Sequence, residues 1–480
     1  MGRLQDLSEG KTRSYTHSMP KPQLDIPQQA FREYDIRGIA GKEITVDLAY
    51  RLGHAFAGML PADEKGQVVV GRDVRLSGPE LQQAVIHGLV DAGRDVLDIG
   101  MVPSPLAYFA VFQTNAAGCV VITASHNPAK YNGFKLMRGK QSLHGDEIQH
   151  LMLCMQQDFE EKKAASPGHV RQQDICRPYH EYVLADIKLK RPLKVVIDAG
   201  NGPSGIIAAP LYRDLCPGKP CEVIELFCEP DGRFPNHHPD PTVEENLQAL
   251  KASVLEHQAD IGIAFDGDGD RIGVVDERGE VIWGDMLLIL LARELLRDYP
   301  GATVISEAKS SRHLYADIEK NGGTAVMWRT GHSPIKAKMK ETGALLAGEM
   351  SGHFFFADRY FGFDDAAYAG ARLMQLLAAQ DKPLSKLLTD IPESFVTPEI
   401  RLDCAEERKF ALVEEAKAWF LAQGHTIIDV DGMRLEFDDA WGLLRASNTQ
   451  PALVLRCEAG SQERLNEVKA LLEDWLAAQP

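Results

Sequence analysis

The chain reads Val68-Val-Val-Gly71, then a helical stretch over residues 79–92, then Val96-Leu-Asp-Ile99 and Cys119-Val-Val-Ile122. Short apolar segments of this kind are typical of buried strands, and the stretch between them has the length and pattern of a helix. A comparable alternation returns at residues 193–198 and 302–305. Alternating strands and helices predict α/β domains with mainly parallel sheets and right-handed crossovers.

The chain changes character from about Phe395 onward. A helix is predicted at residues 406–422, and short strands follow it. The last helix places its apolar residues on one face: Leu465, Val468, Leu471, Leu472 and Trp475. This mixture, without the earlier alternation of strand and helix, predicts a C-terminal α+β domain.

Length and charge limit the class of protein. The chain has 480 residues, of which 44% are hydrophobic, and a formal net charge of −17. This length predicts roughly three domains, and the apolar content is sufficient for several cores. The acidic balance argues against nucleic-acid binding. The longest apolar run, residues 286–292, has about seven residues, which is too short for a transmembrane helix.

The N-terminal segment and the cysteines indicate the compartment. Residues 1–26 are polar, lack the apolar centre of a signal peptide, and are expected to form a disordered leader. The eight cysteines are scattered and form no Cys-x-x-Cys pair: Cys119, Cys154, Cys176, Cys216, Cys221, Cys228, Cys404 and Cys457. Scattered cysteines favour reduced thiols and a cytoplasmic protein.

Residues 266–271 read Asp-Gly-Asp-Gly-Asp-Arg. Alternate glycines allow an irregular turn to bring the carboxylates of Asp266, Asp268 and Asp270 onto one hard cation, and such an open site suits magnesium. An EF-hand is excluded because its sixth position, which needs glycine, is Arg271, and because both flanks read as strands. A hairpin turn rich in Asp-Gly remains the alternative for this motif alone.

Residues 123–128 read Thr-Ala-Ser-His-Asn-Pro and follow the predicted strand at 119–122. Ser125 is therefore expected on the loop at a strand's carboxyl end, where open α/β sheets bind ligands. A helix cap or a turn is the alternative for this motif alone. A Ser-His catalytic pair with His126 is not expected, because adjacent residues on an extended loop point apart and there is no G-x-S-x-G elbow.

The serine and the carboxylates together point to phosphoryl transfer. A serine hydroxyl is a poor phosphoryl acceptor, and its phosphate is a reluctant donor. Such chemistry therefore needs a divalent cation and cationic side chains to neutralise the phosphate oxygens. The pairing predicts metal-assisted phosphoryl transfer through a phosphoserine.

With these motifs the chain resembles the α-D-phosphohexomutases. Further motifs in the same order extend the resemblance over nearly the whole chain: Tyr34-Asp-Ile-Arg-Gly38, Asn132-Gly-Phe-Lys135, Thr330-Gly-His-Ser333, Gly348-Glu-Met-Ser-Gly-His353 and Arg445-Ala-Ser-Asn-Thr449. The fourth of these is similar to the sugar loop of the bacterial bifunctional phosphomannomutase/phosphoglucomutases. Phosphoglucosamine mutases usually carry Gln where Met350 stands, so mannose and glucose phosphates are favoured.

The resemblance implies three similar α/β domains with mixed, mainly parallel sheets and a C-terminal α+β domain, arranged around a central cleft. We predict the following boundaries: 1–26 for the leader, 27–177 for domain I with the phosphoserine loop, 178–280 for domain II with the metal loop, 281–393 for domain III with the sugar-binding loop, and 394–480 for domain IV with a phosphate-binding loop.

The resemblance also implies roles for individual residues. The catalytic set is Ser125, Arg37, Lys135 and His332, and the metal ligands are Ser125, Asp266, Asp268 and Asp270. The substrate-binding set is Tyr34, Arg271, Lys309, Glu349, Ser351, His353, Arg445, Ser447, Asn448, Thr449 and Arg456. Without the resemblance, Arg37 also fits an exposed ion pair, Lys135 a solvated lysine and His332 a structural histidine.

The implied activity is reversible conversion of hexose 1-phosphate to hexose 6-phosphate, for mannose and glucose, through a phosphoserine and a reorienting 1,6-bisphosphate. Mg²⁺ is the implied cofactor and hexose 1,6-bisphosphate the activator. The expected partners are hexose phosphates, with no nucleic acid and no membrane. A monomer is expected, and a dimer stays open. The alternatives are a phosphoglucosamine mutase, a metal-dependent phosphomonoesterase with a serine nucleophile, and a silent sugar-phosphate-binding protein.

Overall fold

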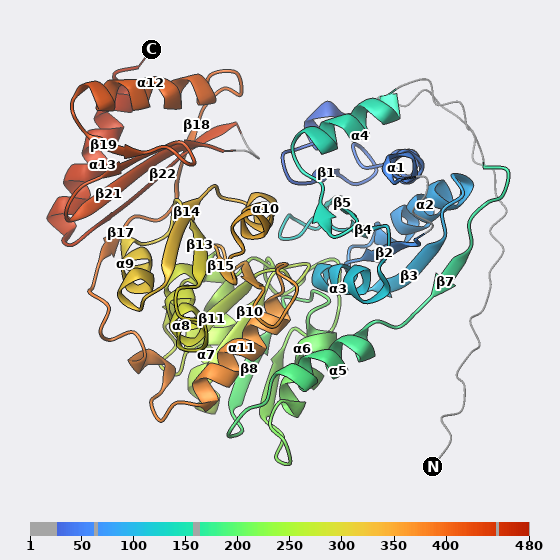
Figure 1. Cartoon of the computed structure of the whole chain (residues 1–480), viewed down its shortest axis with the longest axis horizontal. Helices are drawn as coiled ribbons and strands as arrows, with labels where there is room; N and C mark the ends of the chain where they lie inside the picture. Colours follow the sequence, from blue (N-terminus) through green and yellow to red (C-terminus); the bar gives the residue numbers. More distant parts are fainter. Residues whose placement is uncertain (1–25, 62–65, 157–163, 448–450, 480) are drawn as a thin grey trace. The chain divides into compact units, whose positions relative to one another are not determined.

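The structure is a computed structural model that describes residues 26–61, 66–156, 164–447 and 451–479. The chain forms two compact units. The first unit contains the residues up to 275 and residues 365–379. The second unit contains residues 276–364 and the residues from 380 onward. The predicted leader, apart from Ile26, lies outside the described residues. Figure 1 shows the elements of each unit in sequence colours.

The first unit contains two sheets. The first sheet has the order β1-β5-β4-β2-β3-β7, and β6 also pairs with β5. Its strands are β1 (Ile36–Ile39), β2 (Val68–Arg72), β3 (Val96–Met101), β4 (Gly118–Ile122), β5 (Tyr131–Arg138), β6 (Gln141–Ser142) and β7 (Val170–Gln172). β2 lies parallel to β3 and β4, whereas β5 lies antiparallel to β1 and β4. The sheet is mixed, and the strands predicted at 68–71, 96–99 and 119–122 are confirmed.

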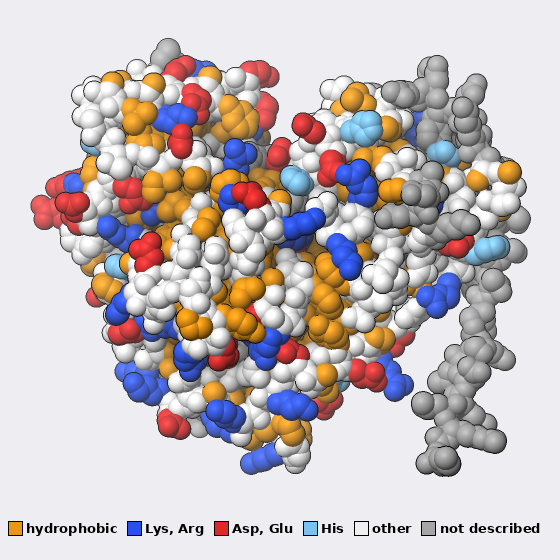
Figure 2. All heavy atoms as spheres, viewed as in Figure 1, with side chains coloured by type: hydrophobic (Ala, Val, Ile, Leu, Met, Phe, Trp, Pro, Cys, Tyr) orange, Lys and Arg blue, Asp and Glu red, His pale blue; other side chains and the backbone are white. Residues whose placement is uncertain are grey.

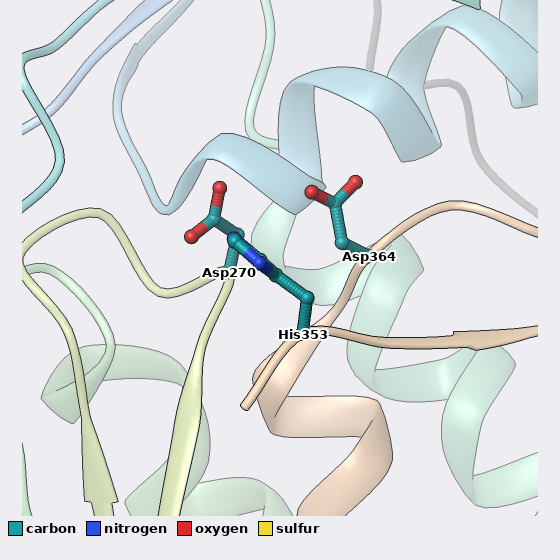
Figure 3. A group of neighbouring side chains, drawn as sticks. All are labelled: Asp270, His353 and Asp364. Atoms are coloured by element: carbon teal, nitrogen blue, oxygen red, sulfur yellow. The ribbon is translucent and has the colours of Figure 1, made fainter. Parts of the chain in front are cut away.

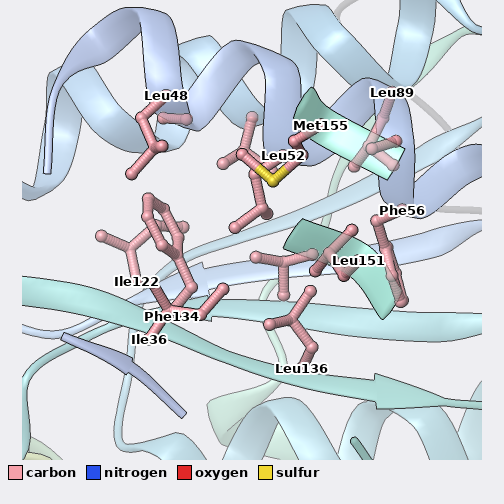
Figure 4. Close-up of a cluster of buried hydrophobic side chains, with 14 of the residues drawn as sticks. Ile36, Leu48, Leu52, Phe56, Leu89, Ile122, Phe134, Leu136, Leu151 and Met155 are labelled. Atoms are coloured by element: carbon pink, nitrogen blue, oxygen red, sulfur yellow. The ribbon is translucent and has the colours of Figure 1, made fainter. Parts of the chain in front are cut away.

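Helices supply the apolar layer on this sheet. They are α1 (Val46–Met59), α2 (Gly78–Asp91), α3 (Ser104–Thr114) and α4 (Asp146–Gln156), preceded by the short η1 (Gln28–Ala30). In Figure 4, Leu52 and Phe56 of α1 lie over Phe134 and Leu136 of β5, all of them buried. Burial of each such side chain contributes about 1.5–3 kcal/mol. This core holds β4 and β5 in place, and these two strands carry the predicted Ser125 loop and Lys135.

The second sheet includes the order β11-β10-β8-β9. Its strands are β8 (Lys194–Asp198), β9 (Glu222–Leu226), β10 (Ile261–Phe265) and β11 (Ile272–Asp276), and its helices are α5 (Cys176–Asp186), α6 (Gly205–Asp214), η2 (Glu244–Leu247), α7 (Gln248–His257) and α11 (Ala366–Ala378). Every residue of β10 and β11 is buried. α11 belongs here although it is distant in sequence, because Tyr212 Oη donates to the carbonyl oxygen of Ala367 at 3.0 Å.

The second unit begins with β12 (Val281–Ile282) and the third sheet, which has the order β14-β13-β15-β16. The strands are β13 (Thr303–Glu307), β14 (Thr324–Trp328), β15 (Leu346–Gly348) and β16 (Phe354–Phe356), and the helices are α8 (Gly284–Asp298), α9 (Arg312–Lys320) and α10 (His332–Thr342). β13 confirms the strand predicted at 302–305. It lies parallel to β14 and β15, as expected for this α/β region.

The fourth sheet has the order β17-β22-β21-β20-β19, and β18 also pairs with β22. Its elements are η3 (Leu384–Lys386), β17 (Phe395–Val396), β18 (Ile400–Asp403), α12 (Lys409–Ala422), β19 (Thr426–Ile428), β20 (Met433–Glu436), β21 (Ala440–Ala446), β22 (Ala452–Ala459) and α13 (Gln462–Ala477). α12 begins at Lys409 instead of the predicted residue 406, because a turn precedes it in which the Arg408 N–H donates to Ala405. The α+β prediction is confirmed.

Alternation along β21 and β22 gives this sheet two different faces. Leu444 and Leu455 lie on the face that packs against α12 and α13, together with Leu472 of α13. Trp441 and Arg445 point to the other face. Arg445 and Arg456, two of the residues that the sequence predicts for phosphate binding, therefore lie on the face away from the helices.

Three further features concern the surface charge, the hydropathy of the helices and the state of the cysteines. On the face seen in Figure 2, Lys and Arg side chains are interspersed with Asp and Glu and do not form one basic patch. Among the described residues, no helix has both the length and the apolar character needed to cross a membrane. All eight cysteines fall within the described ranges, and each is a free thiol.

Candidate functional site

The acidic loop, residues 266–271, connects β10 to β11 in the first unit. Asp266 Oδ1 accepts the backbone N–H groups of Gly269, Asp270 and Arg271 at 2.9, 3.1 and 3.2 Å, which folds the loop over its own first carboxylate. Gly269 has φ +77°, a conformation that L side chains rarely adopt, and a Cβ on Gly267 would lie 2.4 Å from the carbonyl oxygen of Ser125. The alternate glycines are therefore required by the conformation and by the close approach of the two loops.

Three buried carboxylates meet in this loop. Asp266, Asp268 and Asp270 each offer an oxygen within 4.8 Å of the others, and each residue is at most 1% exposed. Asp268 Oδ1 is buried and has no hydrogen-bond partner among the described residues, so it can accept a cation. Burial raises the pKa of Asp266 well above its ordinary value, and the charges of Asp270 and Asp268 raise it further. Asp270 is labelled in Figure 3.

Lys135 of β5 lies against two of these carboxylates. Its Nζ donates to Asp268 Oδ2 at 2.7 Å and to Asp270 Oδ2 at 2.5 Å. Burial disfavours the charged ammonium, but the two carboxylates outweigh burial and raise the pKa of Lys135 well above its ordinary value. When all three carboxylates are ionised, they and the Lys135 ammonium together carry a charge of about −2, which a divalent cation would balance, and aspartate oxygens are suitable ligands for such an ion. The loop could hold a metal ion.

Ser125 follows β4, as predicted, at the edge of the sheet where the parallel strands end. Its Oγ donates to Asp266 Oδ2 at 2.8 Å, so the serine and the acidic loop are brought together. The expectation that His126 points away from Ser125 was wrong. Ser125 Oγ lies 3.0 Å from His126 Nδ1, because Ser125 has φ +49° and the chain turns there instead of running extended.

Arg37 of β1 lies beside the same loop. Its Nη1 donates to Asn127 Oδ1 at 3.0 Å, and its Nε donates to Asp35 Oδ2 at 2.7 Å. The ion pair considered from the sequence is therefore present, but it is largely buried and is next to the Ser125 loop. Tyr34, two residues before β1, and Arg271, at the end of the acidic loop, are both partly exposed.

Sequence reasoning missed the residues that support these loops. Ser104, at the start of α3, donates from its hydroxyl to Asp268 Oδ2 at 2.5 Å. Asp73 and Arg75 follow β2 and are completely buried, and Thr123 follows β4. Asp73, Arg75 and Thr123 could have been identified from the sequence. Each follows a predicted strand, β2 or β4, and the carboxyl ends of parallel strands meet at one edge of a sheet.

In the second unit, Lys309 follows β13 and is 6% exposed. Its Nζ lies 3.5 Å from Glu307 Oε2 and 3.3 Å from Glu399 Oε2. Burial raises the pKa of Glu307, and the Lys309 ammonium opposes that shift. Glu307, another residue not identified from the sequence, also accepts the backbone N–H of Met350 at 3.1 Å. It therefore links Lys309 to the predicted sugar loop.

The predicted sugar loop joins β15 to β16 and brings Glu349, Ser351 and His353 together. Glu349 Oε2 lies 2.6 Å from His353 Nδ1, and Ser351 Oγ lies 3.2 Å from the same nitrogen. Burial would raise the pKa of Glu349, but the His353 hydrogen bond and other donors outweigh burial and lower the pKa. The loop therefore presents an ionised carboxylate.

His332, at the start of α10, lies in the same neighbourhood. The rings of His332 and His353 are 5.8 Å apart, and His332 Nδ1 lies 3.5 Å from Asp364 Oδ2. Figure 3 labels His353 and Asp364. Lys336, one turn further along α10, donates to Asp364 Oδ1 at 3.0 Å.

The predicted phosphate-binding residues are only partly described. Arg445 of β21 pairs with Asp431 at 2.9 Å, and Arg456 of β22 is 8% exposed. Arg456 lies opposite Leu443 in the register of β21 and β22, so the two side chains share a face of the sheet. Leu443 and Arg445 are two residues apart on β21 and also share a face, so both arginines lie on the same side. Ser447 is 5% exposed. Asn448 and Thr449 lie outside the described residues.

Four consecutive segments match the domains of one protein family. Residues 28–161, 177–279 and 283–395 match the alpha/beta/alpha domains I, II and III of the phosphoglucomutase/phosphomannomutase family, and residues 399–474 match its C-terminal domain.

Relatives of nearly the same length agree. The chain is 49% identical over 456 residues to a phosphoglucomutase of Neisseria gonorrhoeae, covering 93% of this chain and 97% of that protein. It is 46% identical over 453 residues to a phosphomannomutase/phosphoglucomutase of Pseudomonas aeruginosa, covering 94% and 96%. The crystal structure of a phosphoglucomutase/phosphomannomutase family protein from Burkholderia thailandensis is similar, with a TM-score of 0.87, 44% identity, and coverage of 95% and 98%. This chain therefore belongs to the phosphoglucomutase/phosphomannomutase family.

Proposed function

We propose that the protein is a phosphomannomutase/phosphoglucomutase that interconverts hexose 1-phosphates and hexose 6-phosphates. The observation that carries this proposal is the contact of 2.8 Å between Ser125 Oγ and Asp266, beside Asp268, Asp270 and Lys135. A nucleophilic hydroxyl at a buried acidic metal site is what phosphoryl transfer through a phosphoserine requires. The names of the relatives support the same activity.

Ser125 carries the phosphoryl group in this proposal. It donates the group to the 6-hydroxyl of a hexose 1-phosphate, and the resulting 1,6-bisphosphate reorients and returns its 1-phosphate to Ser125. Mg²⁺ bound by Asp266, Asp268 and Asp270 would neutralise phosphate oxygens. Arg37 and the charged Lys135 supply further positive charge beside the phosphoryl group. Hexose 1,6-bisphosphate restores the phosphoserine when the intermediate is lost.

The second-unit residues bind the remainder of the substrate in this proposal. Glu349, Ser351 and His353 hydrogen-bond the sugar hydroxyls, with His332 and Lys309 close to the same loop. Arg445, Ser447, Asn448, Thr449 and Arg456 hold the distal phosphate, because guanidinium groups and short donors satisfy the oxygens of a dianion. Tyr34 and Arg271 complete the substrate-binding set. We also propose a cytoplasmic monomer with domain boundaries near residues 177, 280 and 393.

Mass spectrometry and kinetics test the proposal together. The purified protein should carry a phosphate on the peptide containing Ser125, and it should convert mannose 1-phosphate and glucose 1-phosphate to their 6-phosphates when Mg²⁺ and bisphosphate are supplied. Glucosamine 1-phosphate should be converted far more slowly. Preferred turnover of glucosamine 1-phosphate would favour a phosphoglucosamine mutase, and release of inorganic phosphate without a sugar product would favour a phosphomonoesterase.

Replacement of Glu349 by alanine should lower kcat/KM about ten- to hundredfold for mannose and glucose 1-phosphates alike, since a charge-assisted hydrogen bond contributes about 1.5–3 kcal/mol. The two sugars differ only at the 2-hydroxyl, whereas we expect this loop to read the 3- and 4-hydroxyls. The measurement is steady-state kinetics on both sugars, and the wild-type efficiencies should differ by no more than about two orders of magnitude.

Glu349→Gln is the matched control for this variant. The amide keeps an oxygen that can accept the Gly331 N–H, which donates to Glu349 Oε1 at 2.6 Å, but it removes the charge. Glu349→Gln should therefore preserve the conformation of the loop and still lower kcat/KM substantially. A selective loss for one sugar, in either variant, would contradict a loop that reads hydroxyls common to both.

A further inference from the structure

The backbone of Ser125 has an unfavourable conformation. Its φ of +49° lies in the left-handed region, which residues with a Cβ rarely occupy. The residue is also 1% exposed, so water does not stabilise its backbone groups. The surrounding protein must hold this conformation, and it is this turn that brings Ser125 Oγ to 2.8 Å from Asp266 Oδ2.

Both backbone polar groups of Ser125 are held by buried side chains. Its N–H donates to Thr123 Oγ1 at 2.9 Å, and its carbonyl oxygen accepts from Arg75 Nη2 at 2.7 Å. The N–H precedes φ in the chain, and the carbonyl follows ψ. Fixing both groups therefore fixes the two soft backbone torsions of this residue.

Asp73 joins these two contacts into a closed ring. Thr123 Oγ1 donates to Asp73 Oδ2 at 2.8 Å, and Arg75 Nε donates to the same oxygen at 3.0 Å. Asp73 Oδ1 accepts the backbone N–H of Arg75 at 2.9 Å. Asp73 and Arg75 are both 0% exposed. Strands β2 and β4 are parallel neighbours, so the ring ties the segment after β2 to the Ser125 loop.

The guanidinium of Arg75 uses all five of its N–H donors within the protein. Nε reaches Asp73, and Nη2 reaches the carbonyl oxygens of Ser125 and Asn127, the latter at 2.6 Å. Nη1 reaches the carbonyl oxygens of Pro128 and Tyr131 at 2.8 and 2.9 Å. Because a guanidinium has five N–H groups, none remains for a phosphate oxygen. Arg75 therefore differs in role from a phosphate-binding arginine.

We infer that Arg75, with Asp73 and Thr123, is a positioning unit that holds Ser125 in its left-handed conformation and aims its hydroxyl at the acidic loop. The inference rests on the proposed phosphoryl transfer. This role depends on the planar guanidinium with its five N–H groups, and not on the positive charge alone. A lysine ammonium offers three donors from one atom and cannot reach four separated carbonyl oxygens. Lysine should therefore fail to replace Arg75.

The smallest change that tests the positioning role removes the hydroxyl of Thr123. Thr123→Val removes the acceptor for the Ser125 N–H and keeps the side-chain shape, whereas Thr123→Ser keeps the hydroxyl. We expect the valine variant to lose about hundredfold in kcat, since a misplacement of about 1 Å has an effect of this size. KM should change by no more than about threefold, because the substrate contacts are made by other residues. The serine variant should retain most of the turnover.

Arg75→Lys should reduce kcat at least as strongly as Thr123→Val. Leu52→Ala is the control for a general loss of stability, because Leu52 is buried in the α1 core and lies away from the loop. It should lower the melting temperature and leave kcat near the wild-type value. Equal losses of kcat in Leu52→Ala and in Thr123→Val, at a temperature where both are folded, would overturn the positioning role.

Crystal structures of wild type and Thr123→Val separate this inference from the proposed function. We expect φ of Ser125 to remain positive in the wild type and to leave the left-handed region, or to become heterogeneous, in the valine variant. An unchanged Ser125 conformation together with unchanged kcat would overturn the inference even if the enzyme is an active mutase. Absence of phosphate on wild-type Ser125 would overturn the proposed function, and the conformational comparison would still decide the positioning role.

Discussion

Replacement of Ser125 by alanine is expected to lower mutase turnover by several orders of magnitude. The variant lacks the oxygen that carries the phosphoryl group in the proposed mechanism and that lies 2.8 Å from Asp266 Oδ2. Phosphate-monoester cleavage is so slow in water that the protein must lower the barrier by on the order of 20 kcal/mol, and the covalent route accounts for a large share. Turnover should be measured with both hexose 1-phosphates and with bisphosphate supplied.

Folding should survive this change. The variant removes one small hydroxyl from a loop, and such substitutions usually alter the free energy of unfolding by only about 1 kcal/mol. Ser166→Ala, at an exposed serine of the same unit, is the matched control and should keep full turnover. Phosphate incorporation should disappear only in Ser125→Ala. Turnover at the wild-type level in that variant would show that the phosphoryl group is carried elsewhere.

Asp268→Asn is expected to give the second largest loss, about 10² to 10³ in kcat with a raised Mg²⁺ requirement. Asp268 offers Oδ1 to a cation while Oδ2 accepts from Ser104 and Lys135. The amide removes one negative charge from the loop and leaves the buried Lys135 with one carboxylate fewer. Removal of one electrostatic contact to the charge of the transition state typically lowers kcat by about 10² to 10³, which accounts for the size of the change.

The measurement for Asp268→Asn is a titration of rate against Mg²⁺ at saturating sugar. The apparent metal constant should increase strongly, and KM for the sugar phosphate should change little, because other residues hold the distal phosphate. Asp214→Asn, whose side chain is 55% exposed at the end of α6, is the control. Metal dependence identical in Asp268→Asn and wild type would exclude the acidic loop as the catalytic metal site.

The sequence predicted the strands and loops that position this site because their signals are local. The apolar runs at 261–265 and 119–122 became β10 and β4, and the glycines at 267 and 269 have the conformational roles that their pattern indicated. The resemblance added residues such as Lys135 and Glu349, whose contacts depend on strands distant in sequence. Their roles in catalysis and binding stay predictions.

Other features could not be predicted from local pattern. Ser125 was expected on an extended loop, and its positive φ follows from contacts with Arg75 and Thr123, which only the folded arrangement of β2 and β4 creates. Arg75 has no local sequence signature, because four of its five partners are backbone carbonyl oxygens of residues 125–131, which lie about fifty residues later in the chain. The placement of α11 in the first unit likewise depends on tertiary contacts with Tyr212, which carry no sequence signature.

Transfer of a labelled phosphoryl group tests whether Ser125 carries the phosphoryl group between sugars. The protein is labelled with a ³²P-labelled hexose 1,6-bisphosphate, freed of excess label, and chased with unlabelled glucose 1-phosphate in the presence of Mg²⁺. We expect the label on the peptide containing Ser125 before the chase and in sugar phosphate after it. Label on another residue, or label released as inorganic phosphate independently of the sugar, would contradict phosphoryl transfer through Ser125.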